Sequence, residues 1–121
     1  MKSHWTHHNG KRILIADFSN FGGDAAALQA EVEGVKELLK QEIPSSVNAV
    51  TYVEGTFANP EVLQVLAGLL PYSNKYVKKR ALVGVAGFRK YFIDNVANLM
   101  GNVHFKPFET LDRALDWIAI D

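Results

Sequence analysis

The stretch from Arg80 to Phe92, RALVGVAGFRKYF, constrains the fold of this chain more than any other. Residues Ala81 to Val85 form the apolar, β-branched run that is typical of a buried strand. The run passes through Gly84 and Gly87 directly into a predicted helix that begins near Phe88. A strand, a glycine turn and a helix N-terminus in succession are typical of α/β proteins, and ligands or partners often bind at such a turn. The sequence therefore predicts an α/β domain built around this unit.

An Asn9-Gly10 pair near the amino terminus predicts a β-hairpin, because both central residues of a type I′ turn need positive φ. Its two arms are Ser3 to His8 and Lys11 to Asp17, and the second arm holds a consecutive apolar run, Ile13 to Ala16. Such a run fits a strand that is covered on both faces, so this arm is expected to be central in the sheet. Further strands are predicted at Val47 to Val53 and at Val103 to Lys106.

Helices are predicted from apolar spacing and from capping residues. The first follows Asp24 and runs to about Glu42, with Leu28, Val32, Val35 and Leu39 on its buried face. The second begins at Pro60, is capped by Asn59, and is ended or kinked by Pro71. The third runs from Phe88 to Gly101, and the last follows Thr110, with Leu111, Ala114, Leu115 and Ile118 buried. The periodicity does not decide whether Tyr72 to Lys79 adds another helical turn.

These elements follow one another in the order β-β-α-β-α-β-α-β-α, within one domain that spans residues 1–121. Connections of this length between strands imply parallel strands with helices covering the sheet. The predicted fold class is therefore α/β, with a mixed, mostly parallel five-stranded sheet. We expect the first strand alone to run antiparallel, at an edge, and the strand from Ala81 to lie innermost.

Composition argues against several classes of function. The 121 residues include no cysteine, which removes disulfides, thiolate metal sites and cysteine nucleophiles and fits a cytoplasmic location. Thirteen basic residues balance thirteen acidic ones, so bulk charge gives no reason to expect nucleic acid as a partner. No apolar run approaches the roughly 20 residues of a membrane span, and the amino terminus lacks the apolar run of a secretory signal.

The stretch between Glu61 and Asp94 contains no acidic residue. Its basic residues are Lys75, Lys78, Lys79, Arg80, Arg89 and Lys90. The run from Lys75 to Arg80 is predicted to be a solvated face rather than a nucleic-acid groove, because phosphate-binding surfaces usually have a wider basic footprint.

Three loops at the carboxyl ends of the parallel strands form the candidate site, because ligands and partners bind beyond those ends in open parallel sheets. The loops are Asp17 to Asp24, Glu54 to Asn59 and Gly84 to Lys90. They carry the aromatic residues Phe18, Phe21, Phe57 and Phe88 and the polar residues Ser19, Asn20, Thr56, Arg89 and Lys90. Aromatic residues in loops indicate a contact surface or the lid of an apolar pocket, and the alternative is that they fold inward and cover the core.

Other chemistry finds little support in the sequence. On an extended strand His4 and His8 share a face but lie roughly 13 Å apart, at about 3.3 Å per residue, and His7 points the other way, so the three do not form one metal site. The segment from Gly84 to Gly87 lacks the third glycine of a dinucleotide fingerprint and the Lys-Ser pair of a Walker loop. A tight turn that needs positive φ or close packing explains these glycines better, with phosphate binding as the alternative. We expect no cofactor, no metal and no catalytic residue.

Three segments resemble the STAS-like, SpoIIAA-like group, the broad superfamily of anti-sigma-factor antagonists and sulfate-transporter tail domains. They are the opening hairpin HHNGKRILIADFS, the segment KKRALVGVAG and the ending FETLDRALDWI. The resemblance covers nearly the whole chain. It implies a non-enzymatic regulatory or binding module that works through protein contacts, with some relatives suspected of holding nucleotides or lipids.

A phosphorylation switch is part of what this resemblance implies. In the anti-sigma antagonists, a serine at the start of the helix after the third strand is phosphorylated. The matching region, Glu54 to Pro60, has no serine, and Thr56 is its only hydroxyl. A phosphate at a helix N-terminus is physically favourable, so Thr56 is the one candidate for this role.

The leading hypothesis is a regulatory module that contacts a protein partner, or a second copy of itself as a homodimer, through the loops at the carboxyl ends of the strands. The alternative is a small-ligand module that holds a lipid or an anionic metabolite between these loops, with Arg89 or Lys90 facing its charge. A small hydrolase or transferase is the third hypothesis.

Overall fold

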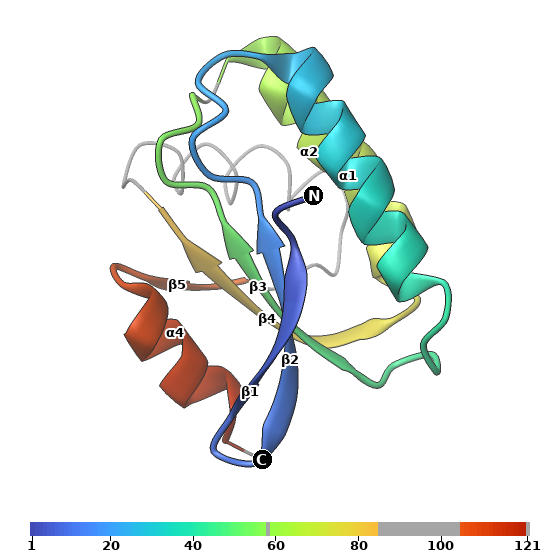
Figure 1. Ribbon diagram of the computed structural model, residues 1–121, viewed down its shortest axis with the longest axis vertical. Coiled ribbons are helices and arrows are strands. Elements are labelled where there is room, and N and C mark those ends of the chain that lie inside the picture. The colour runs from blue at the N-terminus through green and yellow to red at the C-terminus, as the bar shows by residue number, and fades with distance from the viewer. Residues whose placement is uncertain (58, 85–104, 121) are drawn as a thin grey trace.

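Five strands pair into one sheet in the computed structural model, which describes residues 1–57, 59–84 and 105–120 (Figure 1). The strands are β1 (His4–His8), β2 (Lys11–Asp17), β3 (Val47–Tyr52), β4 (Val77–Val83) and β5 (Lys106–Phe108), and they lie in the order β1-β2-β3-β4-β5. β1 runs antiparallel to β2, whereas the neighbours from β2 to β5 pair in parallel. The predicted α/β class, with a mixed and mostly parallel sheet and its antiparallel strand at an edge, is confirmed.

Helices cover both faces of this sheet. α1 (Ala25–Leu39) and α2 (Pro60–Ser73) lie side by side on one face, and α4 (Leu111–Ile118) lies on the other (Figure 1). The predicted residues cap them, and each side chain accepts a hydrogen bond from a backbone N–H three residues later: Asp24 from Ala27, Asn59 from Val62 and Thr110 from Arg113. These bonds satisfy N–H groups that the first turn of a helix leaves without partners. The helix predicted from Phe88 to Gly101 lies outside the described residues.

The hairpin between β1 and β2 turns at the predicted pair, where Asn9 and Gly10 have φ of 51° and 79°. All four residues from Ile13 to Ala16 are buried, as predicted, and they alternate between two cores. Leu14 packs with α1 and α2, whereas Ile15 packs with α4, because successive side chains of a strand point to opposite faces of the sheet. A strand between two helical layers therefore needs apolar residues at every position.

The two helices on the first face differ from their predicted ends. α1 stops at Leu39 rather than near Glu42, where a turn follows in which the Glu42 N–H donates to the Leu39 carbonyl at 2.9 Å. α2 continues past Pro71 to Ser73. A proline in the last turn removes a single backbone donor, and the N–H of Asn74 still reaches the Leu70 carbonyl at 2.9 Å.

The order and the bounds of β3, β4 and β5 also differ from those that the sequence predicted. The middle strand is β3 rather than the strand that contains Ala81, because β5 adds one strand beyond β4. β4 begins at Val77, so the stretch left undecided by periodicity contains the end of α2, a turn and the start of β4. β5 begins at Lys106 rather than at Val103, which lies outside the described residues, and Pro107 is tolerated because β5 is an edge strand.

Candidate functional site

The loops that follow β2 and β3 lie together at one end of the sheet, and we call residues 17–24, 54–57 and 59 the loop end (Figure 1). Backbone hydrogen bonds join the two loops at three points, from Asn20 N–H to Glu54 O at 2.8 Å, from Gly22 N–H to Gly55 O at 3.0 Å and from Phe57 N–H to Gly22 O at 2.7 Å. A parallel bridge between Gly22 and Thr56 continues the pairing of β2 with β3 beyond the strands. The two loops therefore hold each other in one arrangement.

Thr56 lies beneath this surface rather than on it. The residue is 2 % exposed, and its hydroxyl donates to the carbonyl of Phe18 while it accepts the N–H of Phe21 at 3.1 Å. The prediction that Thr56 is a contact residue is therefore wrong. In this conformation its hydroxyl is also not exposed to a kinase, which removes the geometric basis for a phosphorylation switch at this position.

Phe18 and Ser19 are buried as well, so their prediction as contact residues is corrected. Phe18 belongs to the core that packs with α1 and α2. The Ser19 hydroxyl and its backbone N–H both donate to Oδ1 of Asp17, the last residue of β2. For Phe18 the alternative of folding inward is right, because a residue just beyond a strand end still reaches the core that the strand covers.

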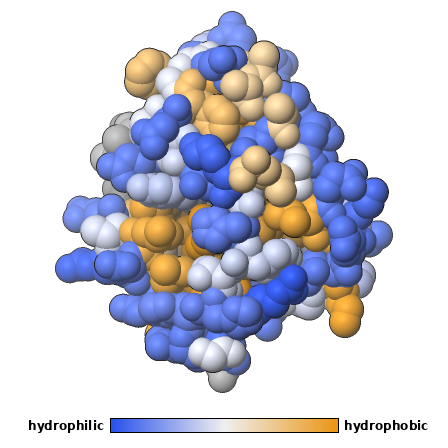
Figure 2. All heavy atoms as spheres, viewed as in Figure 1, coloured by the Kyte–Doolittle hydropathy of each residue, from blue (hydrophilic) through white to orange (hydrophobic). Residues whose placement is uncertain are grey.

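Asn20 and Phe57 are exposed, which is compatible with their prediction as contact residues, whereas Phe21 packs partly against the core. Phe57 is 65 % exposed, Phe21 is half-buried and Asn20 is exposed with a φ of 60°. The Phe57 ring lies against the backbone of the first loop, since a Cβ added at Gly22 would come 3.9 Å from it and one at Gly23 would come 3.8 Å from it. Figure 2 shows hydrophobic side chains among hydrophilic ones at the top of the molecule, where these loops lie. The loop end thus presents an aromatic ring on a hydrogen-bonded backbone.

Lys2 reaches the loop end from the amino terminus, a contact that the sequence pattern did not predict. Its ammonium lies 3.6 Å from Oδ1 of Asp17 and 4.5 Å from the centre of the Phe21 ring, and it donates to the Ser19 carbonyl. A cation over an aromatic face is attracted by the electrons of the ring. Lys2 therefore adds a positive charge to the rim of the aromatic surface.

Glu31, a buried carboxylate of α1, anchors the segment that carries Lys2. Its oxygens accept the backbone N–H of Lys2 at 3.1 Å and that of Ser3 at 2.8 Å. Burial raises the pKa of Glu31, but these hydrogen bonds lower it by more, so the pKa lies below its ordinary value. The one sequence signal for this role is that Glu31 stands three residues after Leu28 and four before Val35, on the apolar stripe of the helix.

The third predicted loop lies mostly outside the described residues, and with it Phe88, Arg89 and Lys90. Gly84 is described, and a Cβ at this position would come 2.4 Å from Cγ2 of Val53. Close packing of β4 against the end of β3 therefore explains this glycine.

Among the described residues no three His, Cys, Asp or Glu side chains come together as a metal site would require. Nδ1 of His4 lies 2.9 Å from the Lys2 carbonyl, and Nε2 of His8 lies 2.6 Å from Oδ1 of Asp116 on α4. Both histidines thus have structural contacts at separate places on β1.

The basic run from Lys75 to Arg80, predicted to be a solvated face, is one only in part: Lys75 and Lys78 are exposed, whereas Lys79 and Arg80 are half-buried. The Arg80 guanidinium donates to Oδ1 of Asn74 at 2.8 Å and lies over the Phe105 ring, 5.6 Å from its centre. Burial lowers the pKa of Arg80 to about 10. Strand pairing explains the difference, because β4 extends through this run and turns some of its side chains toward the protein.

In the part of the chain that the structure describes, none of the helices is long and apolar enough to cross a membrane. Comparison of the chain with protein-family models, with curated proteins and with solved structures gave no match in any of the three.

Proposed function

We propose that this protein is a non-enzymatic regulatory module of STAS-like type, located in the cytoplasm, which contacts a protein partner or a second copy of itself through the loop end. The observation that carries the proposal is the Phe57 ring, 65 % exposed on a backbone that two loops fix by hydrogen bonds. Transfer of apolar surface from water into an interface is favourable, at roughly 25 cal/mol per Å². A backbone that is already ordered loses little further entropy on binding.

The surroundings of Phe57 fit a protein contact. The Phe57 ring lies against Gly22, which follows Phe21, and the Lys2 ammonium lies over the Phe21 ring. The polar residues Asn20 and Asn59 belong to the same two loops. An aromatic centre with a polar rim is the composition that protein interfaces favour, and aromatic residues dominate their binding energy.

The family part of the proposal rests on the resemblance of the hairpin, the β4 segment and the α4 segment to STAS-like domains, and the α/β sheet is compatible with it. Phosphorylation of Thr56 is not part of the proposal, because its hydroxyl is buried between two hydrogen-bond partners. Binding of a lipid or anionic metabolite at the loop end stays a prediction, since it depends on Arg89 and Lys90, outside the described residues.

Sedimentation velocity over a wide concentration range tests the form of the proposal in which the partner is a second copy. We expect Phe57→Ser to weaken the dimer at least about tenfold, as expected for an interface aromatic. The matched control is Ile43→Ser, because Ile43 is 76 % exposed and lies at the opposite end of the sheet, between α1 and β3. Equal effects of the two substitutions, or a natural chain that stays monomeric throughout, would contradict this form.

A further inference from the structure

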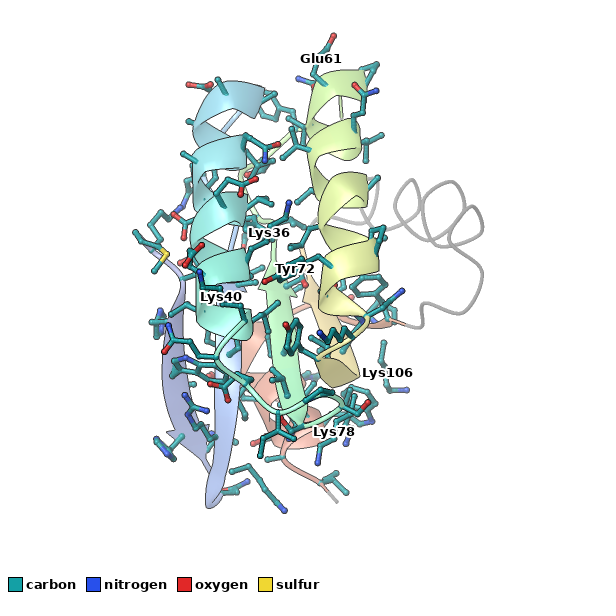
Figure 3. The ribbon with its side chains drawn as sticks, turned by 90° about the vertical axis from the view of Figure 1, so that its right-hand side faces the viewer. Lys36, Lys40, Glu61, Tyr72, Lys78 and Lys106 are labelled. Carbon is teal, nitrogen blue, oxygen red and sulfur yellow. The ribbon has the colours of Figure 1, made fainter. Side chains whose placement is uncertain are left out.

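A second candidate site lies at the end of the sheet opposite the loop end. A hollow of about 240 Å³ opens among the starts of β3 and β4 and the C-terminal end of α4, lined by Asn48, Lys78, Lys79 and Ile120. Figure 3 shows Lys78 at the lower end of the molecule, far from Glu61, which marks the start of α2 at the upper end. A water molecule takes about 30 Å³ of the liquid, so the hollow has room for a small metabolite.

An irregularity in β4 brings two lysines to this hollow. Val47 of β3 pairs with Val77, but Asn48 pairs with Lys79, so Lys78 is an extra residue of β4. In a regular strand, adjacent side chains point to opposite faces of the sheet. A bulge places two residues opposite one and redirects their side chains, and in this sheet both lysines line the same hollow beside Asn48.

Contacts with the end of α4 fix the position of Lys79. Its ammonium donates to the carbonyl of Trp117 at 2.8 Å and to that of Ile120 at 2.7 Å, and it lies 4.3 Å from the centre of the Trp117 ring. An ammonium has three N–H donors, so these two bonds leave one for a ligand. Lys78 is exposed and makes no side-chain hydrogen bond or ion pair with the described part of the chain.

Asn48 supplies an amide in an otherwise apolar part of β3. The residue is 9 % exposed, and its Oδ1 is buried without a hydrogen-bond partner in the described chain. An unsatisfied buried polar atom costs stability, and an apolar side chain would avoid that cost. Oδ1 is an acceptor and would not pair with an anionic ligand, whereas Nδ2 can donate hydrogen bonds to an acceptor in the hollow that Asn48 lines.

We infer that this hollow binds a small organic acid. Its carboxylate accepts hydrogen bonds from Lys78, Lys79 and the Asn48 amide, and its short apolar body lies against Ile120, an exposed hydrophobic residue. The C-terminal end of α4 carries partial negative charge, which disfavours a dianion such as phosphate more than a monoanion.

A nuclear magnetic resonance titration of the whole chain with sodium butanoate tests the inference, at constant ionic strength. We expect saturable shifts of the Asn48 side-chain amide and the Ile120 backbone amide. Butanamide, which has the same shape without the charge, should bind at least about fivefold more weakly, as the loss of ion pairs predicts. Equal binding of the acid and the amide would overturn the inference, and so would phosphate binding more tightly than butanoate.

Matched lysine variants locate the binding. Lys78→Met should weaken butanoate binding about fivefold, whereas Lys75→Met should leave it unchanged, because Lys75 is exposed and lies outside the hollow. Asn48→Asp should abolish binding, since the new carboxylate pairs with Lys79 and repels the ligand. If Asn48→Asp does not fold, Lys78→Met decides the question, because Lys78 is exposed and its replacement leaves the core intact. Equal effects at Lys75 and Lys78 would show a general charge effect and overturn the inference.

Discussion

At the scale of single residues, Thr56 joins the loop that follows β2 to the loop that follows β3, through one buried hydroxyl. Thr56→Val keeps the size of the side chain but leaves the Phe18 carbonyl and the Phe21 N–H without this partner. We expect the free energy of unfolding to fall by about 1–3 kcal/mol, measured by urea denaturation. Thr51→Val, on β3 and half-exposed, is the control and should change it by less than about 0.5 kcal/mol. Equal losses at the two sites would contradict this role of Thr56.

A second prediction at the residue scale concerns Glu31 and the pH dependence of the free energy of unfolding. Because its folded pKa lies below the ordinary value of 4.5, ionised Glu31 stabilises the folded protein above that pH, and the stabilisation is lost as the pH falls through the folded pKa. Glu31→Gln should therefore lower the free energy of unfolding by about 1–3 kcal/mol at pH 7, since it weakens two hydrogen bonds to a charged acceptor.

Urea denaturation at pH 7 and at several values below 4.5 checks this prediction, and the difference between Glu31→Gln and the natural chain should narrow as the pH falls. The control is Glu33→Gln, because Glu33 is exposed on the same helix and should change stability by less than about 1 kcal/mol. A constant difference across the pH range would show that the charge of Glu31 is not responsible.

At the scale of elements, two glycines predict opposite effects of the same substitution. A Cβ at Gly10 or at Gly68 would meet nothing within 4 Å in the part of the chain that the structure describes. Gly10 has a φ of 79° in the hairpin turn, so Gly10→Ala should destabilise the protein by about 1–2 kcal/mol. Gly68 lies within α2, so Gly68→Ala should stabilise it by about 0.5–1 kcal/mol. Urea denaturation of both variants checks the signs, and a shared sign would contradict the assignment of turn and helix.

The elements that the sequence predicted well carry their own local signal. Helix starts were found because Asp24, Asn59 and Thr110 are caps whose hydrogen bonds are local, and the hairpin was found because Asn9-Gly10 suits its turn. The start of β4 and the bounds of β5 were not predicted correctly, because they depend on contacts with other parts of the chain rather than on a local sequence signal. Charged residues in β4 are accommodated by a bulge and by contacts with α4, and Pro107 is accommodated by the edge.

At the scale of the whole molecule, helices cover both faces of the sheet (Figure 1), and the two candidate sites lie at its two ends. The rule that parallel sheets bind at the carboxyl ends of their strands predicted where the loop end lies. It could not separate Phe57, which faces outward, from Phe18, which enters the core, because both are phenylalanines in polar loops. The contact of Lys2 with Asp17 and the place of Asn48 in the hollow were not predicted, because both depend on distant parts of the chain.

Site-specific photo-crosslinking tests the central claim, contact through the loop end, most directly. In one variant a photoreactive phenylalanine derivative replaces Phe57, and in a second variant the same derivative replaces Ile43. Both variants are irradiated in the cells that make them and again after purification. Position 57 is predicted to crosslink to one defined protein, a second copy of the chain or a single partner, which mass spectrometry identifies, and position 43 is predicted not to crosslink to it. Absence of a product at position 57, or the same mixture of products at both positions, would contradict the claim.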